Sequence, residues 1–218
     1  MNYQDIISNV NIYGLQESIV ASGYPMLTQP YNHSDFIDAC KDVVVKGEDS
    51  PHIKRSRKLA NTDIGAGHDN YLNGIIVQFD LKFTVKAWTE AERYHFLDFV
   101  SSMSSMHKLV KMDFDTVFIP YVTKNTRNEM KRLLTLYNEN PCEETKLMLL
   151  YNCPVGLQLT ARMTTNYRQL KTIYQQRKNH PLPEWKAFCK WIEHLYHAEL
   201  IIGANNGDLK ASVGANNE

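Results

Sequence analysis

The stretch GIIVQFDLKFTV, residues 74–85, decides the fold class. Its large apolar side chains occur at every second position, and residues such as Asp80 and Lys82 fill the positions between them. Because successive side chains of a strand point to opposite faces of a sheet, this period of two predicts a half-buried β-strand. The side chains expected to face the core are those of Ile75, Val77, Phe79, Leu81, Phe83 and Val85.

Helical patterns surround this strand. Thr89-Glu90-Ala91-Glu92 has the spacing of a capping box, so we predict that residues 91–109 form a helix. A second helix should cover 160–180, with Met163, Tyr167, Leu170 and Tyr174 as its packing stripe. The remaining predictions are helices at 10–24, 126–139, 142–151 (opened by Pro141) and 185–201, and a short strand at 109–119. The class is therefore α+β, rich in helix.

The domain organisation follows from composition. Residues 1–203 are expected to form one domain of ordinary size. Residues 26–66 show little periodicity, and their basic run KRSRK at 54–58 is most simply a solvated loop face, with a phosphate-contacting loop as the alternative. The segment 204–218 contains GANN twice and little apolar content, so we expect a flexible tail.

The charge balance excludes some classes of function. The 24 basic residues equal the 24 acidic residues, which argues against a nucleic-acid or membrane-surface binder, although a few local arginines could still hold a small anion. The chain has neither a secretory-signal pattern nor an apolar run long enough to cross a bilayer, so a cytoplasmic location is expected.

Metal and disulfide frameworks are not expected either. The cysteines lie far apart without C-x-x-C spacing, which indicates reduced thiols; they are Cys40, Cys142, Cys153 and Cys189. His194 and His197 could share a metal ion, but the pattern offers no third ligand. We therefore predict no metal site.

Three places carry side chains suited to ligand binding. The first is one face of the helix expected at 160–180, which carries Asn166, Leu170, Ile173, Arg177 and His180. Its amide, guanidinium and imidazole groups could together hold a planar heterocycle and a phosphate. The alternative is an exposed polar face. The turn Gly67-His68-Asp69-Asn70 could place an imidazole beside a ligand, or be only a loop. The hydroxyls at 101–105 could receive a phosphate, or form a polar turn.

Taken in order, these places resemble the flavin-dependent thymidylate synthase family. GHDNYLNGIIVQFDL is similar to that family's Gly-His-Glu turn and following strand, and YHFLDFVSSMSSMH to its Arg-His-Arg segment and serine loop. NYRQLKTIYQQRKNHPLPEW resembles its Asn-x-Arg-x-Leu helix with a distal arginine, histidine and tryptophan. The resemblance covers most of residues 66–195 and implies that family's fold, with a central, mostly antiparallel sheet.

The resemblance also implies roles for individual residues. The positions expected around FAD are His68, Asn70, His95, Asn166, Arg168 and His180. The positions expected to bind the pyrimidine nucleotide are Arg93, Ser102, Ser104 and Arg177, with Ser104 and Arg177 in catalytic positions. NADPH and methylene-tetrahydrofolate would be co-substrates, and the family site forms between subunits, so a homo-oligomer, a tetramer, is expected.

Several positions depart from the family pattern. Tyr94 and Phe96 stand where the family has arginines on either side of its central histidine, and Met106 and Leu150 fall near two further arginine positions. Fewer guanidinium groups would weaken phosphate binding, because each supplies a charge-assisted hydrogen bond. Two functions are expected. The first is a divergent enzyme that methylates dUMP or modifies a related pyrimidine deoxynucleotide. The alternative is a non-catalytic homologue that binds or sequesters a nucleotide, for which a phage would be a suitable source.

Overall fold

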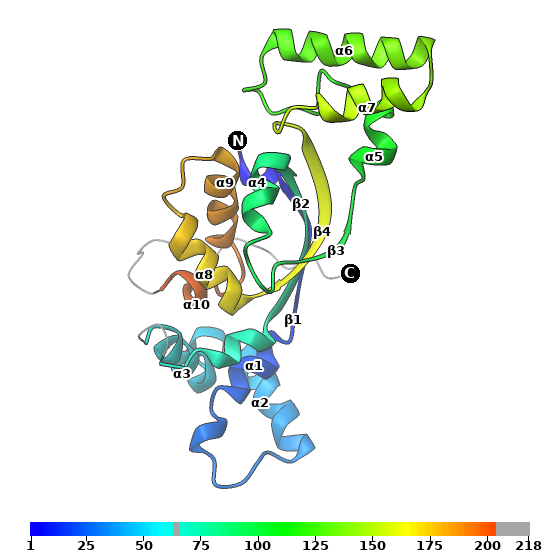
Figure 1. The fold of residues 1–218 in the computed structure, drawn as a ribbon. Coiled ribbons are helices and arrows are strands. Elements are labelled where there is room, and N and C mark those ends of the chain that lie inside the picture. Colours follow the sequence, from blue (N-terminus) through cyan, green and yellow to red (C-terminus); the bar gives the residue numbers. More distant parts are fainter. Residues whose placement is uncertain (63–65, 204–218) are drawn as a thin grey trace.

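The structure is a computed structural model that describes residues 1–62 and 66–203. The tail expected at 204–218 lies outside the described residues. Four strands form one sheet in the order β1-β2-β4-β3, and every neighbouring pair is antiparallel. The strands are β1 (Ile7–Tyr13), β2 (Ile76–Thr84), β3 (Asp98–Ser102) and β4 (Gln158–Asn166). The predicted helix-rich α+β class with a mostly antiparallel sheet is confirmed (Figure 1).

The predicted strand lies at the centre of the sheet as β2. Val77, Phe79, Leu81 and Phe83 have no exposed surface, whereas the alternate side chains remain partly exposed, as the period of two predicted. Every residue of β2 pairs with one of β4, from Ile76 opposite Asn166 to Thr84 opposite Gln158. This long antiparallel ladder fixes the end of β4 beside the start of β2.

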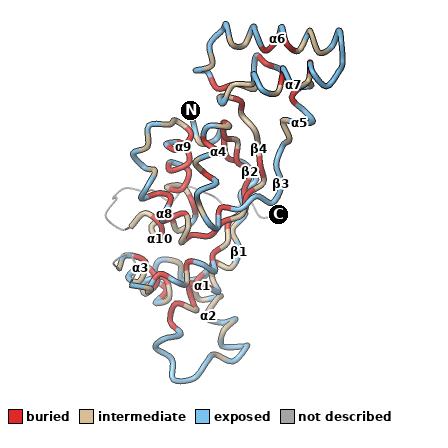
Figure 2. The backbone as a smooth tube through the Cα atoms, in the orientation of Figure 1, coloured by how far each residue is buried: buried red, intermediate tan, exposed pale blue. Residues whose placement is uncertain are grey.

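Helices cover one face of the sheet. In Figure 1, α4 (Val85–Ala91), α8 (Tyr167–Arg177) and α9 (Pro183–Ile192) lie on the same side of the strands, and Figure 2 shows buried backbone along the strands and α9. An aromatic cluster joins the two layers: the Phe79 ring lies 4.6 Å from that of Trp191, and the Phe83 ring 5.1 Å from that of Trp185.

A group of helices lies at each end of the molecule. One group consists of α1 (Leu15–Ala21), α2 (His33–Lys46) and α3 (Pro51–Ala60). At the other end lie α5 (Ser105–Lys108), α6 (Lys124–Glu139) and α7 (Glu143–Tyr151) (Figure 1). A separate small core there takes buried side chains from α6 and α7, among them Met130, Leu133 and Leu149. The chain ends its described part with α10 (Glu199–Ile202). The helices predicted at 126–139 and 142–151 are confirmed as α6 and α7, although Cys142 rather than Pro141 precedes the first turn of α7.

The helix predicted at 91–109 is wrong. The capping residue is Thr84, whose hydroxyl accepts from the Ala87 N–H at 3.1 Å, so α4 begins six residues earlier and ends at Ala91. The following residues turn and become β3, which pairs with β4 at the sheet edge. Pairing with a strand some sixty residues away outweighs the local helical pattern, since the sheet supplies partners for the backbone groups.

The helix predicted at 160–180 is half wrong, because its first part is β4 and only the second part is α8. The segment predicted as a helix at 10–24 is likewise β1 followed by α1. The break falls at Gly14, whose φ is 68°, and a Cβ there would lie 2.6 Å from the Gly74 carbonyl oxygen. A glycine is required at this junction because other residues avoid both the conformation and the contact.

Three smaller predictions are also wrong. The segment predicted as a strand at 109–119 begins with a 3-10 helix, η5 (Leu109–Lys111), and continues as turns with one bridge between Phe118 and Leu157; the carbonyls of Phe114 and Ile119 accept from the Arg127 guanidinium. The helix predicted at 185–201 stops at Ile192, and a separate turn, α10, follows. The basic run 54–58 is not a loop but part of α3, where Arg55 donates to the carbonyls of the last turn of α1. Among the described residues, no helix is both long and apolar enough to cross a membrane.

Candidate functional site

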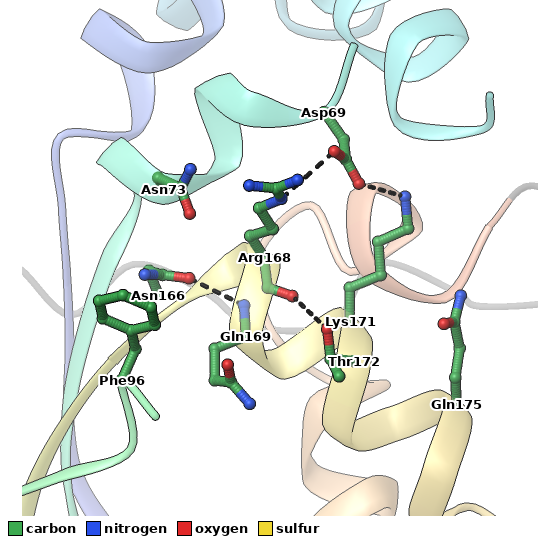
Figure 3. A pocket seen from close by; sticks show the side chains of 9 residues that line it. All are labelled: Asp69, Asn73, Phe96, Asn166, Arg168, Gln169, Lys171, Thr172 and Gln175. Atoms are coloured by element: carbon green, nitrogen blue, oxygen red, sulfur yellow. Dashed lines mark hydrogen bonds and ion pairs between the residues drawn. The ribbon is translucent and has the colours of Figure 1, made fainter. Parts of the chain in front are cut away.

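A polar cavity of about 230 Å³ lies beside the first turns of α8 (Figure 3). It is bordered by the 3-10 helix η4 (Asn70–Gly74), by the turn before β3, and by α8. Its lining residues are Asp69, Asn73, Phe96, Asn166, Arg168, Gln169, Lys171, Thr172 and Gln175. Of the residues predicted to bind FAD, Asn166 and Arg168 line this cavity.

The strand-to-helix junction fixes one wall of the cavity. Asn166 ends β4 and caps α8, its side-chain oxygen accepting from the Gln169 N–H at 2.8 Å. The next residue, Tyr167, is fully buried, and its N–H donates to the Ile75 carbonyl at 3.0 Å. The sheet therefore holds the start of α8, and with it Arg168, in one position.

A buried ion pair lies under the cavity. The Lys171 ammonium donates to Asp69 Oδ2 at 2.9 Å and to the Ala60 carbonyl at 2.7 Å, and both charged residues are more than nine-tenths buried. Arg168 Nε lies 3.4 Å from the other oxygen of Asp69. One carboxylate thus faces two cations, which leaves one surplus positive charge. Arg168 is the more exposed of the two cations, so it is the group that an anionic ligand can reach.

The predicted residues His68 and Asn70 flank Asp69 in the chain. Both side chains are exposed, and neither lines the cavity. The turn is closed by a hydrogen bond from the Asn70 N–H to the Gly67 carbonyl at 3.3 Å. The acid between the two predicted residues, rather than the imidazole, reaches into the site.

Arg177 and His180 lie in a different place, around the carboxylate of Glu90. Arg177 Nη1 donates to Glu90 Oε2 at 3.0 Å, and its Nε donates to the Tyr94 hydroxyl at 2.7 Å. Trp185 Nε1 and His180 Nε2 lie 3.0 and 3.3 Å from the same carboxylate oxygen. Burial raises the pKa of Glu90, but hydrogen bonds from Lys86 and Trp185 outweigh it and hold that pKa below its ordinary value.

The helix stripe proposed from sequence faces the core from Leu170 onward, whereas Asn166 at its start lines the cavity. Leu170 and Ile173 have no exposed surface, and Arg177 continues the same side of α8 into the Glu90 cluster. The residues that line the cavity, including Arg168, Thr172 and Gln175, lie on the other side of the helix. The five stripe residues are not gathered around one cavity, because the side of α8 that carries them packs against the rest of the protein.

The remaining predicted residues are solvent-facing in the single chain. Arg93 and His95 are exposed in the turn after α4, and Ser102 is exposed at the end of β3. Ser104 caps α5, its hydroxyl accepting from the His107 N–H at 3.4 Å. None of these residues lines the cavity, so within one chain they are separate from Arg168.

A histidine and two acids come together elsewhere, next to α10. Ligand atoms of Glu48, His197 and Glu199 lie within 4.8 Å of one another. Arg57 donates to both carboxylates, at 2.5 Å for Glu48 and 2.8 Å for Glu199, so the guanidinium already occupies the centre of the cluster. His194 is not part of it, since its Nδ1 lies 2.7 Å from the Lys190 carbonyl. The cluster is an ion-pair network that ties α3 to α10.

Comparison with known proteins gives structural relatives only. No protein-family model and no curated protein sequence matches the chain. A crystal structure of the flavin-dependent thymidylate synthase ThyX from Helicobacter pylori, complexed with FAD and dUMP, matches with a TM-score of 0.65 and 15% identity, over 89% of this chain and 98% of that chain. The chain has the fold of that enzyme.

A second Helicobacter pylori ThyX structure with FAD and dUMP matches with a TM-score of 0.60 and 16% identity, over 90% of this chain and 96% of that chain. The fold that the sequence resemblance implied is thus confirmed. At this identity the likeness concerns the fold, and the chemistry depends on the residues of this chain. The sequence prediction did not include most of the residues that line the cavity, which are Asp69, Asn73, Phe96, Gln169, Lys171, Thr172 and Gln175. For Lys171 the signal in the sequence was a lysine inside the apolar pattern of α8.

Proposed function

We propose that this protein is a divergent flavin-dependent thymidylate synthase-like protein that binds FAD and a pyrimidine deoxynucleotide. The single observation that carries the proposal is the cavity at the start of α8, where Asn166 and Arg168 lie together above the buried Asp69–Lys171 pair. The Helicobacter pylori ThyX structures that share this fold hold FAD and dUMP. Buried charges that position a partly exposed arginine are typical of a site for an anionic ligand.

The cavity fits part of FAD. Its volume of about 230 Å³ is below the roughly 300–1,000 Å³ of pockets for drug-sized ligands. One ring system of FAD would occupy the cavity, whereas the rest of the dinucleotide would need further surface. Arg168 would neutralise negative charge on the cofactor, and the Asn166 amide would hydrogen-bond it. FAD, when bound, would supply the redox chemistry.

A homo-oligomer, which we propose to be a tetramer, would supply the rest of the site. The predicted groups His68, Asn70, His95 and His180 for FAD, and Arg93, Ser102 and Ser104 for the nucleotide, do not line the cavity of their own chain. Except for His180 beside Glu90 and the half-buried Ser104, these side chains are exposed in one chain, and they become available to the cavity of another when copies pack together. In the divergent-enzyme reading, NADPH and methylene-tetrahydrofolate would be the co-substrates for dUMP methylation or a related modification.

The second candidate is a non-catalytic protein that binds or sequesters a nucleotide. The observation that favours it is the Glu90 carboxylate bonded to Arg177, because this guanidinium is then neutralised inside the chain. Catalysis on a pyrimidine needs fixed cations beside the ring as charge develops. With Arg177 engaged, a nucleotide could be held without being turned over.

Flavin absorbance of the purified full-length protein tests the first part of the proposal. A yellow protein, or one that takes up added FAD with a saturable change in its spectrum, supports it; a colourless protein that takes up none contradicts it. NADPH oxidation that depends on dUMP and disappears in Arg177→Ala supports the enzyme, whereas unchanged turnover in that variant removes Arg177 from the site. Co-purified nucleotide without turnover, identified by mass spectrometry, supports the sequestering protein.

A further inference from the structure

We propose that Phe96 is the stacking residue of the cavity, and that the side-chain amides of Asn73 and Gln169 bind the polar edge of the ring that stacks on it. The inference rests on the proposed function and names the recognition chemistry of that site. The ligand class is a planar heterocycle whose edge carries both carbonyl oxygens and N–H groups, as in a flavin or a pyrimidine.

The backbone of Phe96 is held in an unfavourable conformation. Its φ of 64° lies in the left-handed region, which a bulky L-residue rarely adopts. The chain is anchored close by on each side: the next residue, Leu97, is 4% exposed, and the hydroxyl of Tyr94, two residues before Phe96, donates to Gln176 and accepts from Arg177. The fixed neighbours impose the turn, and strain of this kind occurs most often at functional sites.

The turn leaves the aromatic ring of Phe96 exposed to solvent. Phe96 is 64% exposed, although it borders a cavity and follows the buried layer of α4. The neighbouring Phe99 differs, because its ring lies 4.9 Å from that of Trp88 and therefore has an aromatic partner within the chain. Figure 3 shows the Phe96 ring beside the Asn166 side chain at one end of the cavity. An exposed ring with a free face is suited to stack on a planar ligand.

The other walls carry unused hydrogen-bonding groups. In the part of the chain that the structure describes, the side-chain amides of Asn73 and Gln169 have no hydrogen-bond partner. Each amide offers an acceptor oxygen and two N–H donors. Such groups match a ring edge on which carbonyl oxygens alternate with N–H groups. The surplus positive charge at Arg168 adds attraction for carbonyl oxygens or for a phosphate attached to the ring.

Two substitutions separate stacking from backbone strain. Phe96→Gly removes the ring but accepts a positive φ without strain, so the variant should unfold at the same or a higher temperature than the wild type. Phe96→Trp keeps a stacking face. Tyr151→Ala is the control, since Tyr151 is 85% exposed and lines no part of the cavity.

The experiment is calorimetric titration of the full-length chain and these variants with FAD, riboflavin, dUMP, deoxyuridine and adenosine. We expect Phe96→Gly to weaken binding of the ring ligand by roughly tenfold or more, as loss of base stacking does elsewhere, while Phe96→Trp and Tyr151→Ala stay within about twofold of the wild type. Wild-type affinity in Phe96→Gly overturns the stacking role alone. A third outcome is that the wild type binds adenosine but no flavin or pyrimidine, and that Phe96→Gly no longer binds adenosine. This outcome overturns the proposed function and keeps the stacking role. Binding of no ring ligand by the wild type overturns both.

Discussion

Asp69→Asn should destabilise the protein far more than an ordinary surface substitution. The change removes the carboxylate that faces Lys171 at 2.9 Å and Arg168 at 3.4 Å, while the shape of the side chain is kept. Lys171 is 8% exposed and retains the Ala60 carbonyl as its partner, so its charge stays buried without a counter-ion. Removing one partner of a buried pair costs about 3–5 kcal/mol. We expect the free energy of unfolding to fall by about that amount.

Urea unfolding followed by circular dichroism measures this loss, and a double-mutant cycle identifies its cause. Lys171→Met removes the buried cation with a side chain of similar length. If the unpaired charge causes the loss, Asp69→Asn combined with Lys171→Met should recover most of the stability lost in Asp69→Asn alone, because no buried lysine charge remains. A loss below about 1 kcal/mol in Asp69→Asn, or additive losses in the double variant, would refute this reasoning.

Three further predictions follow from individual contacts. Burial raises the pKa of Glu199, but hydrogen bonds from His197 and Arg57 outweigh it and lower that pKa to about 2. The ionised carboxylate therefore contributes stability that is complete above its ordinary pKa of 4.5 and is lost as the pH falls from about 4.5 to 2. Acid unfolding should show this loss, and Glu199→Gln should flatten that part of the curve. Glu90→Gln removes the negative charge that neutralises Arg177. Titration with dUMP should therefore give a Kd that is lower by roughly tenfold than in the wild type. A higher Kd would contradict an anion-binding role for this arginine. Gly14→Ala should lower the melting temperature by several degrees in calorimetry, since φ is 68° and the new Cβ would lie 2.6 Å from a carbonyl oxygen; an unchanged melting temperature would contradict the close approach.

The central strand could be predicted from sequence because its pattern is local. The alternation from Val77 to Phe83 reports burial on one face, and no other part of the chain is needed to interpret it. The edge strand β3 and the first part of the segment at 160–180 could not be predicted in this way. Their extended conformation depends on pairing with each other and with β2, which are far away in the chain.

The candidate site was predictable only in part, for the same reason. Asn166 and Arg168 belong to a motif within three residues, so the resemblance could identify them. The ion pair beneath them joins Asp69 and Lys171, which are 102 positions apart, and no local pattern reveals such a contact. The stripe through Arg177 has correct helical spacing, but spacing does not say whether that side of the helix faces a ligand or the core.

Equilibrium titration of the full-length protein with FAD, with Arg168→Ala measured in parallel, tests the central claim most directly. We expect saturable binding to the wild type, seen as a shifted flavin absorbance and quenched fluorescence. Binding should be at least roughly tenfold weaker in Arg168→Ala, because the half-buried cation above the Asp69–Lys171 pair is lost. A wild-type protein that leaves the flavin spectrum unchanged, or an Arg168→Ala variant that binds FAD as the wild type does, would contradict the account.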